Sequence, residues 1–213
     1  MLDYLEHGGS GDCRALMVWL HGLGADGHDL EPVADMLGLS GVRHVFPHAP
    51  MRPVTINGGM SMRAWFDIAA PDLRVQEDST GMLASAGRVA ELVRALRRDA
   101  AMPVVLGGFS QGAVISLVAA ACGVPGLAGL VAMSGYVPRF LQPALPGLRG
   151  KSVMMAHGEQ DEVIPFALGK AGCETLVQAG LAVDWHAYTM PHTICREEVA
   201  DLAAWLKRLL AAG

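Results

Sequence analysis

Short runs of consecutive apolar residues, each closed by a glycine-rich or polar turn, recur along the chain. The clearest run is residues 15–20 (ALMVWL), which contains no polar position. A strand with one face in water alternates apolar and polar residues, so a continuous run is typical of a strand that is covered on both faces. The pattern predicts further short strands at 42–46, 104–106, 127–133, 152–156 and 183–189.

Between these strands, apolar residues recur with helical spacing. The longest predicted helix is capped by Asp78 or Ser79, and its apolar positions are Leu83, Ala86, Ala90, Val93 and Leu96. Other helices are predicted at 29–39, with Pro32 in the first turn, and at 111–121, 166–179 and 197–210. Strands that alternate with helices indicate an α/β fold with a mostly parallel sheet and helices on both faces. Because no repeat or linker interrupts the chain, we expect residues 1–213 to form one domain.

One segment lacks this alternation of predicted strands and helices. Residues 47–78 show little regular pattern over some thirty positions. A loop of that length inside a compact domain is usually functional or contains short elements that periodicity misses.

Charged residues make up 17% of the chain, against about 25% in an average globular protein. The extreme case is 100–138, which contains no charged residue but many glycines and prolines. Its longest unbroken apolar piece, 113–122, is too short for the roughly 20 residues of a membrane-spanning helix. We therefore expect buried strand–turn–helix–turn–strand structure and no stable membrane insertion. Residues 1–11 contain no apolar run typical of a signal peptide, so we expect a cytoplasmic protein.

The net charge of −5 offers no basic surface for nucleic acid. The one basic cluster, Arg94, Arg97 and Arg98, lies where a helix is predicted to end, and there it complements the helix dipole. The four cysteines are far apart and lack C-x-x-C spacing, which argues against a disulfide framework or a zinc site and favours a reducing compartment.

A candidate nucleophile follows the strand predicted at 104–106. Residues 108–112 (GFSQG) match G-x-S-x-G, the nucleophile elbow, in which flanking glycines relieve crowding around a serine held in a strained turn. The alternative is a glycine-rich turn with an idle serine. The predicted strand–turn–helix context favours Ser110 as the nucleophile.

A serine hydroxyl needs a base, and this architecture places the histidine after the serine and the acid. Three histidines follow Ser110. His186 lies within an alternating strand, and His157 is only a few residues from the acid candidates. His192 lies in a loop before the last helix, where it could reach the elbow, so we assign it as the base.

The loop after the strand at 152–156 offers three acids, Glu159, Asp161 and Glu162. We favour Asp161, which lies mid-loop before the chain turns into the next helix. Its neighbours have ordinary alternatives, as solvated loop charges or as charges at a helix N-terminus.

Acyl transfer also needs N–H donors for the developing oxyanion. One is expected from the backbone of Gln111, directly after the nucleophile. The other is expected from the glycine-rich loop 21–27, most plausibly at Leu23. A phosphate-binding loop is the alternative, but G-x-G-x-x-G and Walker patterns are absent. We expect His21 to brace this loop.

These motifs together resemble the carboxylesterase / acyl-protein thioesterase (lysophospholipase-like) family of serine α/β-hydrolases over nearly the whole chain, and most closely its short bacterial carboxylesterases. The segments that carry the resemblance are 19–24 (WLHGLG), 47–50 (PHAP), 52–59 (RPVTINGG), 62–67 (MRAWFD), 108–112 (GFSQG), 157–161 (HGEQD) and 188–195. The resemblance implies an α/β-hydrolase fold with Ser110, Asp161 and His192 as catalytic triad. It also implies Leu23 and Gln111 as oxyanion donors, and a loop 51–65 that borders the substrate. Pro191 is a departure, because a small flexible residue is expected before the histidine.

The resemblance implies a serine carboxylesterase that needs no metal or organic cofactor and has no separate lid domain. Leu23, Met60, Met62 and Trp65, with Met51, could line an apolar acyl site, although each could equally fill the core. We expect short- to medium-chain esters as substrates. An acyl-protein thioesterase or lysophospholipase acting on longer chains is the alternative, and a non-enzymatic acyl-binding protein would need a broken triad. The resemblance is also compatible with a homodimer.

Overall fold

A central sheet of seven strands organises the molecule, in the order β1-β3-β2-β6-β7-β8-β9. The computed structural model describes residues 1–8, 13–73 and 75–211, so the end of the segment 1–11 and Arg74 in the loop 47–78 lie outside the described residues. All neighbours in the sheet pair in parallel except β1, which is antiparallel to β3. The strands are β1 (Tyr4–His7), β2 (Ala15–Leu20), β3 (Val42–Pro47), β6 (Val104–Phe109), β7 (Leu127–Met133), β8 (Ser152–Gly158) and β9 (Ala182–Tyr188).

The apolar run in β2 is explained by two separate cores. Leu16, Val18 and Leu20 join one hydrophobic cluster, whereas Met17 and Trp19 belong to a second cluster on the opposite face. Successive side chains of a strand point to opposite faces, so a strand between two helical layers needs apolar residues at every position. The prediction of a doubly covered strand is therefore confirmed.

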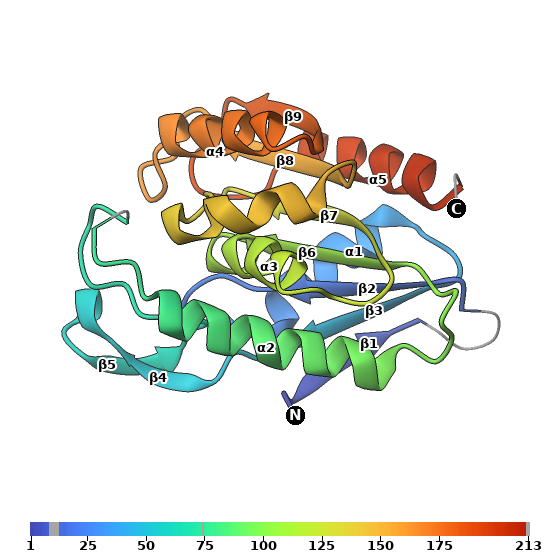
Figure 1. Cartoon of the computed structure of the whole chain (residues 1–213), viewed down its shortest axis with the longest axis horizontal. Helices are drawn as coiled ribbons and strands as arrows, with labels where there is room; N and C mark the ends of the chain where they lie inside the picture. The colour runs from blue at the N-terminus through green and yellow to red at the C-terminus, as the bar shows by residue number, and fades with distance from the viewer. Residues whose placement is uncertain (9–12, 74, 212–213) are drawn as a thin grey trace.

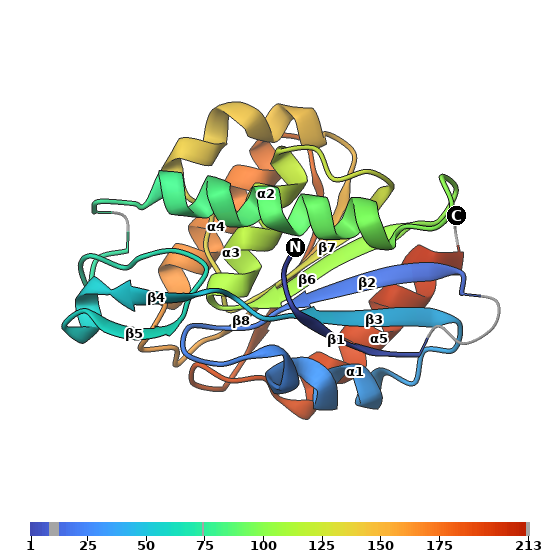
Figure 2. The same cartoon turned by 90° about the horizontal axis from the view of Figure 1, so that it is seen from below.

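Helices form the outer layers on both sides of the sheet, as the two views show (Figures 1 and 2). α1 (Glu31–Leu37) and α5 (Arg196–Ala211) contact each other and cover the face with Met17 and Trp19. α2 (Ser79–Leu96), α3 (Gln111–Ala121) and α4 (Phe166–Gln178) cover the other face. α3 is buried almost all round because it lies between the sheet, α2 and a 3-10 segment η3 (Arg139–Leu148). This burial accounts for the charge-free stretch 100–138.

Helix α2 begins as predicted, with the Asp78 carboxylate accepting a hydrogen bond from the Gly81 N–H at 2.8 Å. One predicted core position is wrong, since the Leu83 side chain is exposed. Met82 and Val89 lie on the buried side instead. Helix α2 ends at Leu96, so Arg94 lies in its last turn and Arg97 at its C-cap, where the basic cluster was predicted to lie. The guanidinium of Arg97 donates to the Met102 carbonyl beyond the helix.

The helix predicted at 29–39 is shorter. A 3-10 turn η1 (Gly27–Leu30) precedes α1, and Asp26 caps this turn by accepting from the His28 N–H. α1 ends at Leu37 because Gly38 adopts a left-handed φ of 58°.

The long segment 47–78 contains a hairpin, β4 (Met51–Val54) and β5 (Met60–Arg63), joined by a 3-10 turn η2 (Thr55–Asn57). β1 and η3 were likewise not predicted. Within the described residues, no helix is both long enough and apolar enough to cross a bilayer.

Candidate active site

Ser110 occupies the sharp turn between β6 and α3. Its φ of 57° and ψ of −119° lie in a region that residues with a side chain rarely adopt. The Ser110 N–H donates to the Met133 carbonyl at the end of the neighbouring strand β7, at 2.9 Å. This bond fixes the strained turn at the carboxyl edge of the sheet, where open α/β folds bind their ligands.

The two glycines of G-x-S-x-G are required by close backbone contacts. A Cβ on Gly108 would lie 2.3 Å from the carbonyl carbon of Gly112. A Cβ on Gly112 would lie 1.8 Å from the Leu20 carbonyl oxygen. The elbow therefore tolerates no side chain at either position, which is the strand–turn–helix context predicted from the motif.

Asp161 and His192 meet beside this turn, although they come from loops that follow different strands. His192 Nδ1 donates to Asp161 Oδ2 at 2.7 Å, because a carboxylate can only accept. The His192 ring also lies against Phe109, with 4.7 Å between ring centroids. Asp161 Oδ1 accepts from the backbone N–H groups of Val163 and Ile164, at 2.9 and 2.8 Å. The hydrogen-bonded pair of His192 and Asp161 is thus fixed next to Phe109, the residue that precedes Ser110.

The loop that carries His192 is held by backbone contacts despite Pro191. The Met190 carbonyl accepts from the Gln160 N–H at 3.1 Å, and the Pro191 carbonyl accepts from the Thr193 N–H at 2.8 Å. Gly158 lets the loop approach, since a Cβ there would lie 2.3 Å from the Met190 oxygen. Pro191 adds stiffness to a loop that is already positioned.

The glycine-rich loop after β2 lies against Ser110. A Cβ on Gly22 would be 3.5 Å from the Ser110 Cβ. His21 braces the loop as expected: its Nδ1 donates to the Gly22 carbonyl at 2.7 Å, and its Nε2 accepts from the Ala49 N–H at 3.0 Å. Burial lowers the pKa of His21 to about 4, so the imidazole is neutral and suited to this donor–acceptor role.

Two backbone N–H groups near Ser110 are available as donors. Gln111 is the first residue of α3, so its N–H has no partner within the helix. The Leu23 N–H forms no hydrogen bond with the described part of the chain. These are the two donors assigned from the sequence.

The residues predicted to contact the substrate differ in burial and in their distance from the loop 21–27. The Trp65 side chain is fully buried, and its Nε1 donates to the His21 carbonyl at 2.9 Å. Trp65 therefore does not line a groove, and its side chain instead supports the start of the loop 21–27. Met60 is 65% exposed on the hairpin. Met62 lies beside the oxyanion loop, with its sulfur 3.8 Å from the position of a Cβ on Gly24.

The Gln111 side chain links the hairpin segment to the elbow. Its Oε1 accepts from the Trp65 N–H and its Nε2 donates to the Phe66 carbonyl, both at 3.0 Å. Sequence reasoning used only the backbone of Gln111. The Gln111 amide contacts residues that are 46 and 45 positions away in the sequence, and no local sequence pattern predicts such a contact.

His157 is a neighbour of the pair that sequence reasoning set aside. It is fully buried, its Nε2 donates to the Ile164 carbonyl at 2.8 Å, and the same nitrogen lies 3.4 Å from Asp161 Oδ2. Burial lowers the pKa of His157, so its ring is neutral. The sequence signal for this contact was the short separation between His157 and the acid candidates. His157 packs behind Asp161 and is not the candidate base.

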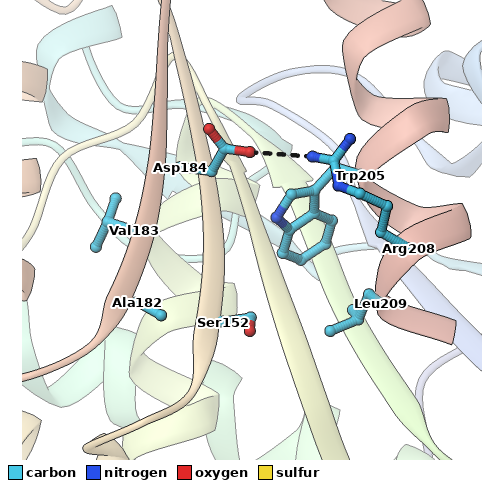
Figure 3. Close-up of a pocket in the computed structure, with 7 residues that line it drawn as sticks. All are labelled: Ser152, Ala182, Val183, Asp184, Trp205, Arg208 and Leu209. Carbon is cyan, nitrogen blue, oxygen red and sulfur yellow. Dashed lines mark hydrogen bonds and ion pairs between the residues drawn. The ribbon is translucent and has the colours of Figure 1, made fainter. Parts of the chain in front are cut away.

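Two hollows lie near the carboxyl edge of the sheet, and the second of them includes His192 in its wall. One, of about 310 Å³, is bounded by Pro71, Asp72, Leu73, Pro165, Ala167, Leu168 and Ala171. The other, of about 340 Å³, is bounded by Asp29, Leu30, Val33, Phe109, His192, Thr193 and Ile194. A larger hollow of about 470 Å³ lies at the amino ends of β8 and β9, where Arg208 pairs with Asp184 at 3.3 Å (Figure 3). That hollow is at the wrong edge of the sheet to serve Ser110.

Among the described residues, no group of three or more histidine, cysteine or acidic side chains is placed to hold a metal ion.

Glu198 is a buried carboxyl in the first turn of α5, just after the His192 loop. It has no exposed surface, and neither oxygen has a hydrogen-bond partner among the described residues. Burial raises the pKa of Glu198 to about 8, so the folded protein keeps this side chain protonated at neutral pH.

We expect this proton to make stability depend on pH. Because the folded pKa lies above the ordinary value of 4.5, the native state binds more protons than the unfolded state between about pH 4.5 and 8. Stability should therefore fall as pH rises through this window. In urea titrations, the free energy of unfolding of the wild type should fall by about 4 kcal/mol more between pH 5 and 9 than that of Glu198→Gln. The exposed neighbour substitution Glu197→Gln should keep the wild-type dependence, and parallel curves for wild type and Glu198→Gln would contradict the assignment.

Known proteins resemble this chain over most of its length. The family model described as phospholipase/carboxylesterase matches residues 8–210. Acyl-protein thioesterase 1 of Mycosarcoma maydis is 37% identical over 222 residues, which cover 93% of this chain and 92% of the relative. The crystal structure of Zea mays acyl-protein thioesterase 2 superposes with a TM-score of 0.89 at 30% identity, covering 99% of this chain and all of that one. The Bacillus cereus carboxylesterase, at 23% identity and a TM-score of 0.79 over 98% of this chain and 95% of its own, shares the fold. The chain therefore belongs to the phospholipase/carboxylesterase family and is a hydrolase with the α/β-hydrolase fold.

Proposed function

We propose that this protein is a serine thioesterase and esterase that removes acyl chains from S-acylated peptides through an acyl-enzyme on Ser110. The observation that carries the proposal is the hydrogen bond between His192 and Asp161 beside the strained elbow. A base held by an acid next to a serine in such a strained turn is the arrangement that activates the serine hydroxyl. The similarity to acyl-protein thioesterases of two organisms supports the choice of thioester over ester.

In the proposed reaction, Ser110 Oγ attacks the carbonyl carbon while His192 Nε2 takes its proton. The oxyanion accepts hydrogen bonds from the Leu23 and Gln111 N–H groups, which have no competing partner in the described chain. His192 then protonates the leaving thiol or alcohol. Water, deprotonated by His192, attacks the acyl-enzyme and releases the fatty acid. Asp161 fixes the imidazole with its proton on Nδ1 and stabilises the charged ring.

We assign the acyl chain to the hollow of about 310 Å³ on the α2, α3 and α4 side of the sheet. Its wall begins at Pro165, four residues after Asp161, and most of its lining is apolar. The volume of this hollow is at the lower end of the range for ligand sites. It suits an extended acyl chain, part of which remains in water.

The alternative is a carboxylesterase for short- to medium-chain esters, and a lysophospholipase is a third outcome. The measurement that separates them is kcat/KM over a series of p-nitrophenyl esters from acetate to palmitate, with an S-palmitoyl peptide and lysophosphatidylcholine. Our proposal expects kcat/KM to rise from acetate through octanoate, and expects cleavage of the peptide thioester. A maximum at butyrate with no cleavage of the peptide would establish the carboxylesterase, and faster cleavage of lysophosphatidylcholine than of the peptide would establish the lysophospholipase.

The hollow itself is tested by filling it. Ala171→Trp places a large ring among its walls, so the ratio of dodecanoate to butyrate hydrolysis should fall at least about ten-fold. Val177→Trp, at an exposed position on the same helix α4, is the matched control and should keep the wild-type ratio. Equal ratios in both variants would place the acyl chain elsewhere.

A further inference from the structure

The second hollow at the site lies on the opposite side of the sheet. Its walls come from η1 and α1 (Asp29, Leu30 and Val33), from Phe109, and from the loop His192–Ile194. Leu30 and Val33 belong to the core under α1 and α5, whereas Ile164 and Leu168 near the first hollow belong to the core under α2, α3 and α4. The two hollows thus lie on opposite faces of the sheet, and Phe109, the residue before Ser110, is in the wall of the second.

The chemistry of the triad assigns a role to this second hollow. His192 must protonate the leaving group, so the leaving group lies on the His192 side of the scissile bond. The His192 ring, in contact with Phe109, forms part of the wall. An acyl chain in the first hollow therefore directs the leaving group into the second.

One carboxylate, that of Asp29, lines this hollow. The Asp29 carboxylate accepts no hydrogen bond and forms no ion pair within the described chain, and it is accessible to solvent. The nearby Asp26 is already engaged, because it accepts from both the backbone N–H and the ring of His28. Partial burial, followed by the charge of Asp26, raises the pKa of Asp29. A cation in the hollow would relieve this unpaired negative charge.

The apolar part of the lining suits the same kind of ligand. Leu30, Val33 and Ile194 offer hydrocarbon surface, and the Phe109 ring, which is also in the lining, would attract a cation that lies over its face. A leaving group with a methylene or methyl surface around a positive charge would match both features. A sulfonate or phosphate would meet only repulsion from Asp29.

We propose that this hollow receives the leaving group and that Asp29 selects leaving groups that carry a positive charge close to the bond being cleaved. The inference rests on the proposed function, because it needs an acyl group to be transferred to Ser110. The class of substrate is a cationic thioester or ester, such as an S-acyl cysteine next to lysine or arginine, or an acyl choline. The two sources share the ammonium or guanidinium group, and the test uses the simplest compound that carries it.

The experiment compares two thioesters with the same acyl group, S-octanoyl thiocholine and S-octanoyl 3,3-dimethylbutanethiol, in which carbon replaces the charged nitrogen. The wild type should favour the cationic compound about five-fold or more in kcat/KM, since one carboxylate at a few ångströms acts through a partly aqueous medium. The preference should shrink in about 0.5 M salt. In Asp29→Asn the ratio should fall to about one, and Asp29→Lys should favour the S-octanoyl thioester of mercaptoethanesulfonate.

The control is Asp35→Asn, which changes the net charge equally from an exposed position on α1 that does not line the hollow. It should keep the wild-type ratio. If the wild type cleaves both thioesters and the ratio is the same in Asp29→Asn, the inference about Asp29 is wrong and the proposed function stands. If the wild type cleaves neither thioester, the proposed function itself fails.

Discussion

Replacing Ser110 with alanine is expected to lower kcat for p-nitrophenyl octanoate by roughly 10⁴- to 10⁶-fold. No other hydroxyl occupies the strained position at the end of β6, and alanine leaves the elbow backbone and both oxyanion donors in place. The residual rate should then be that of water assisted by the oxyanion donors alone. The measurement is kcat with the variant, together with labelling by a fluorophosphonate, which should be lost in parallel.

Ser134 is the matched control for this experiment. It is the other serine that ends a sheet strand with a positive φ, at 47° after β7, and its hydroxyl has no partner among the described residues. It is, however, fully buried, so a substrate cannot reach it. Ser134→Ala should therefore keep fluorophosphonate labelling and most of the activity. If labelling survives in Ser110→Ala and disappears in Ser134→Ala, the nucleophile is Ser134, at the end of β7, and the assignment of Ser110 is wrong.

The elements predicted best are those whose local sequence is compatible with only one structure. The run in β2 has apolar residues at both odd and even positions, and only a strand between two cores buries both sets. The elbow was predicted for a similar reason. Gly108 and Gly112 touch backbone so closely that no other residue fits, and this requirement is visible in the sequence as G-x-S-x-G.

The missed elements carry little periodic signal. Half of the residues in the hairpin strands β4 and β5 are exposed and only Val54 is buried, so the two strands show no consistent alternation. β1 is a four-residue edge strand in which no residue is fully buried. Short strands of this kind depend on pairing with distant residues, as β1 does with β3, and a single sequence does not record that pairing.

Trp65 shows that the site, too, depends on contacts with distant residues that a single sequence does not record. An aromatic residue among methionines in a loop resembles a substrate contact, but its burial is decided by His21 and Gln111, 44 and 46 positions away. Asp29 is the reverse case. It reads as an ordinary acid near a helix start, and only the folded chain brings it to the same hollow as His192.

Asp161→Asn is expected to lower kcat by about 10⁴-fold while the protein stays folded. Asp161 Oδ1 accepts two backbone N–H groups, from Val163 and Ile164, so the amide oxygen of asparagine must take this position. The amide nitrogen then faces His192 Nδ1 and donates to it. His192 is forced to carry its proton on Nε2, where it cannot accept the proton of Ser110.

The neighbouring acids of the same loop make this prediction selective. Glu159 and Glu162 are exposed, and Glu159 accepts a hydrogen bond only from the Thr189 hydroxyl among the described residues. Glu159→Gln and Glu162→Gln should each stay within a few-fold of the wild-type kcat, with circular dichroism confirming the fold of all three variants. A large loss in either glutamine variant, with Asp161→Asn active, would assign the acid to another carboxylate. Because the two Asp161 oxygens are divided between the backbone and the imidazole, the loss in Asp161→Asn should come from the wrong tautomer of His192 and not from a displaced loop.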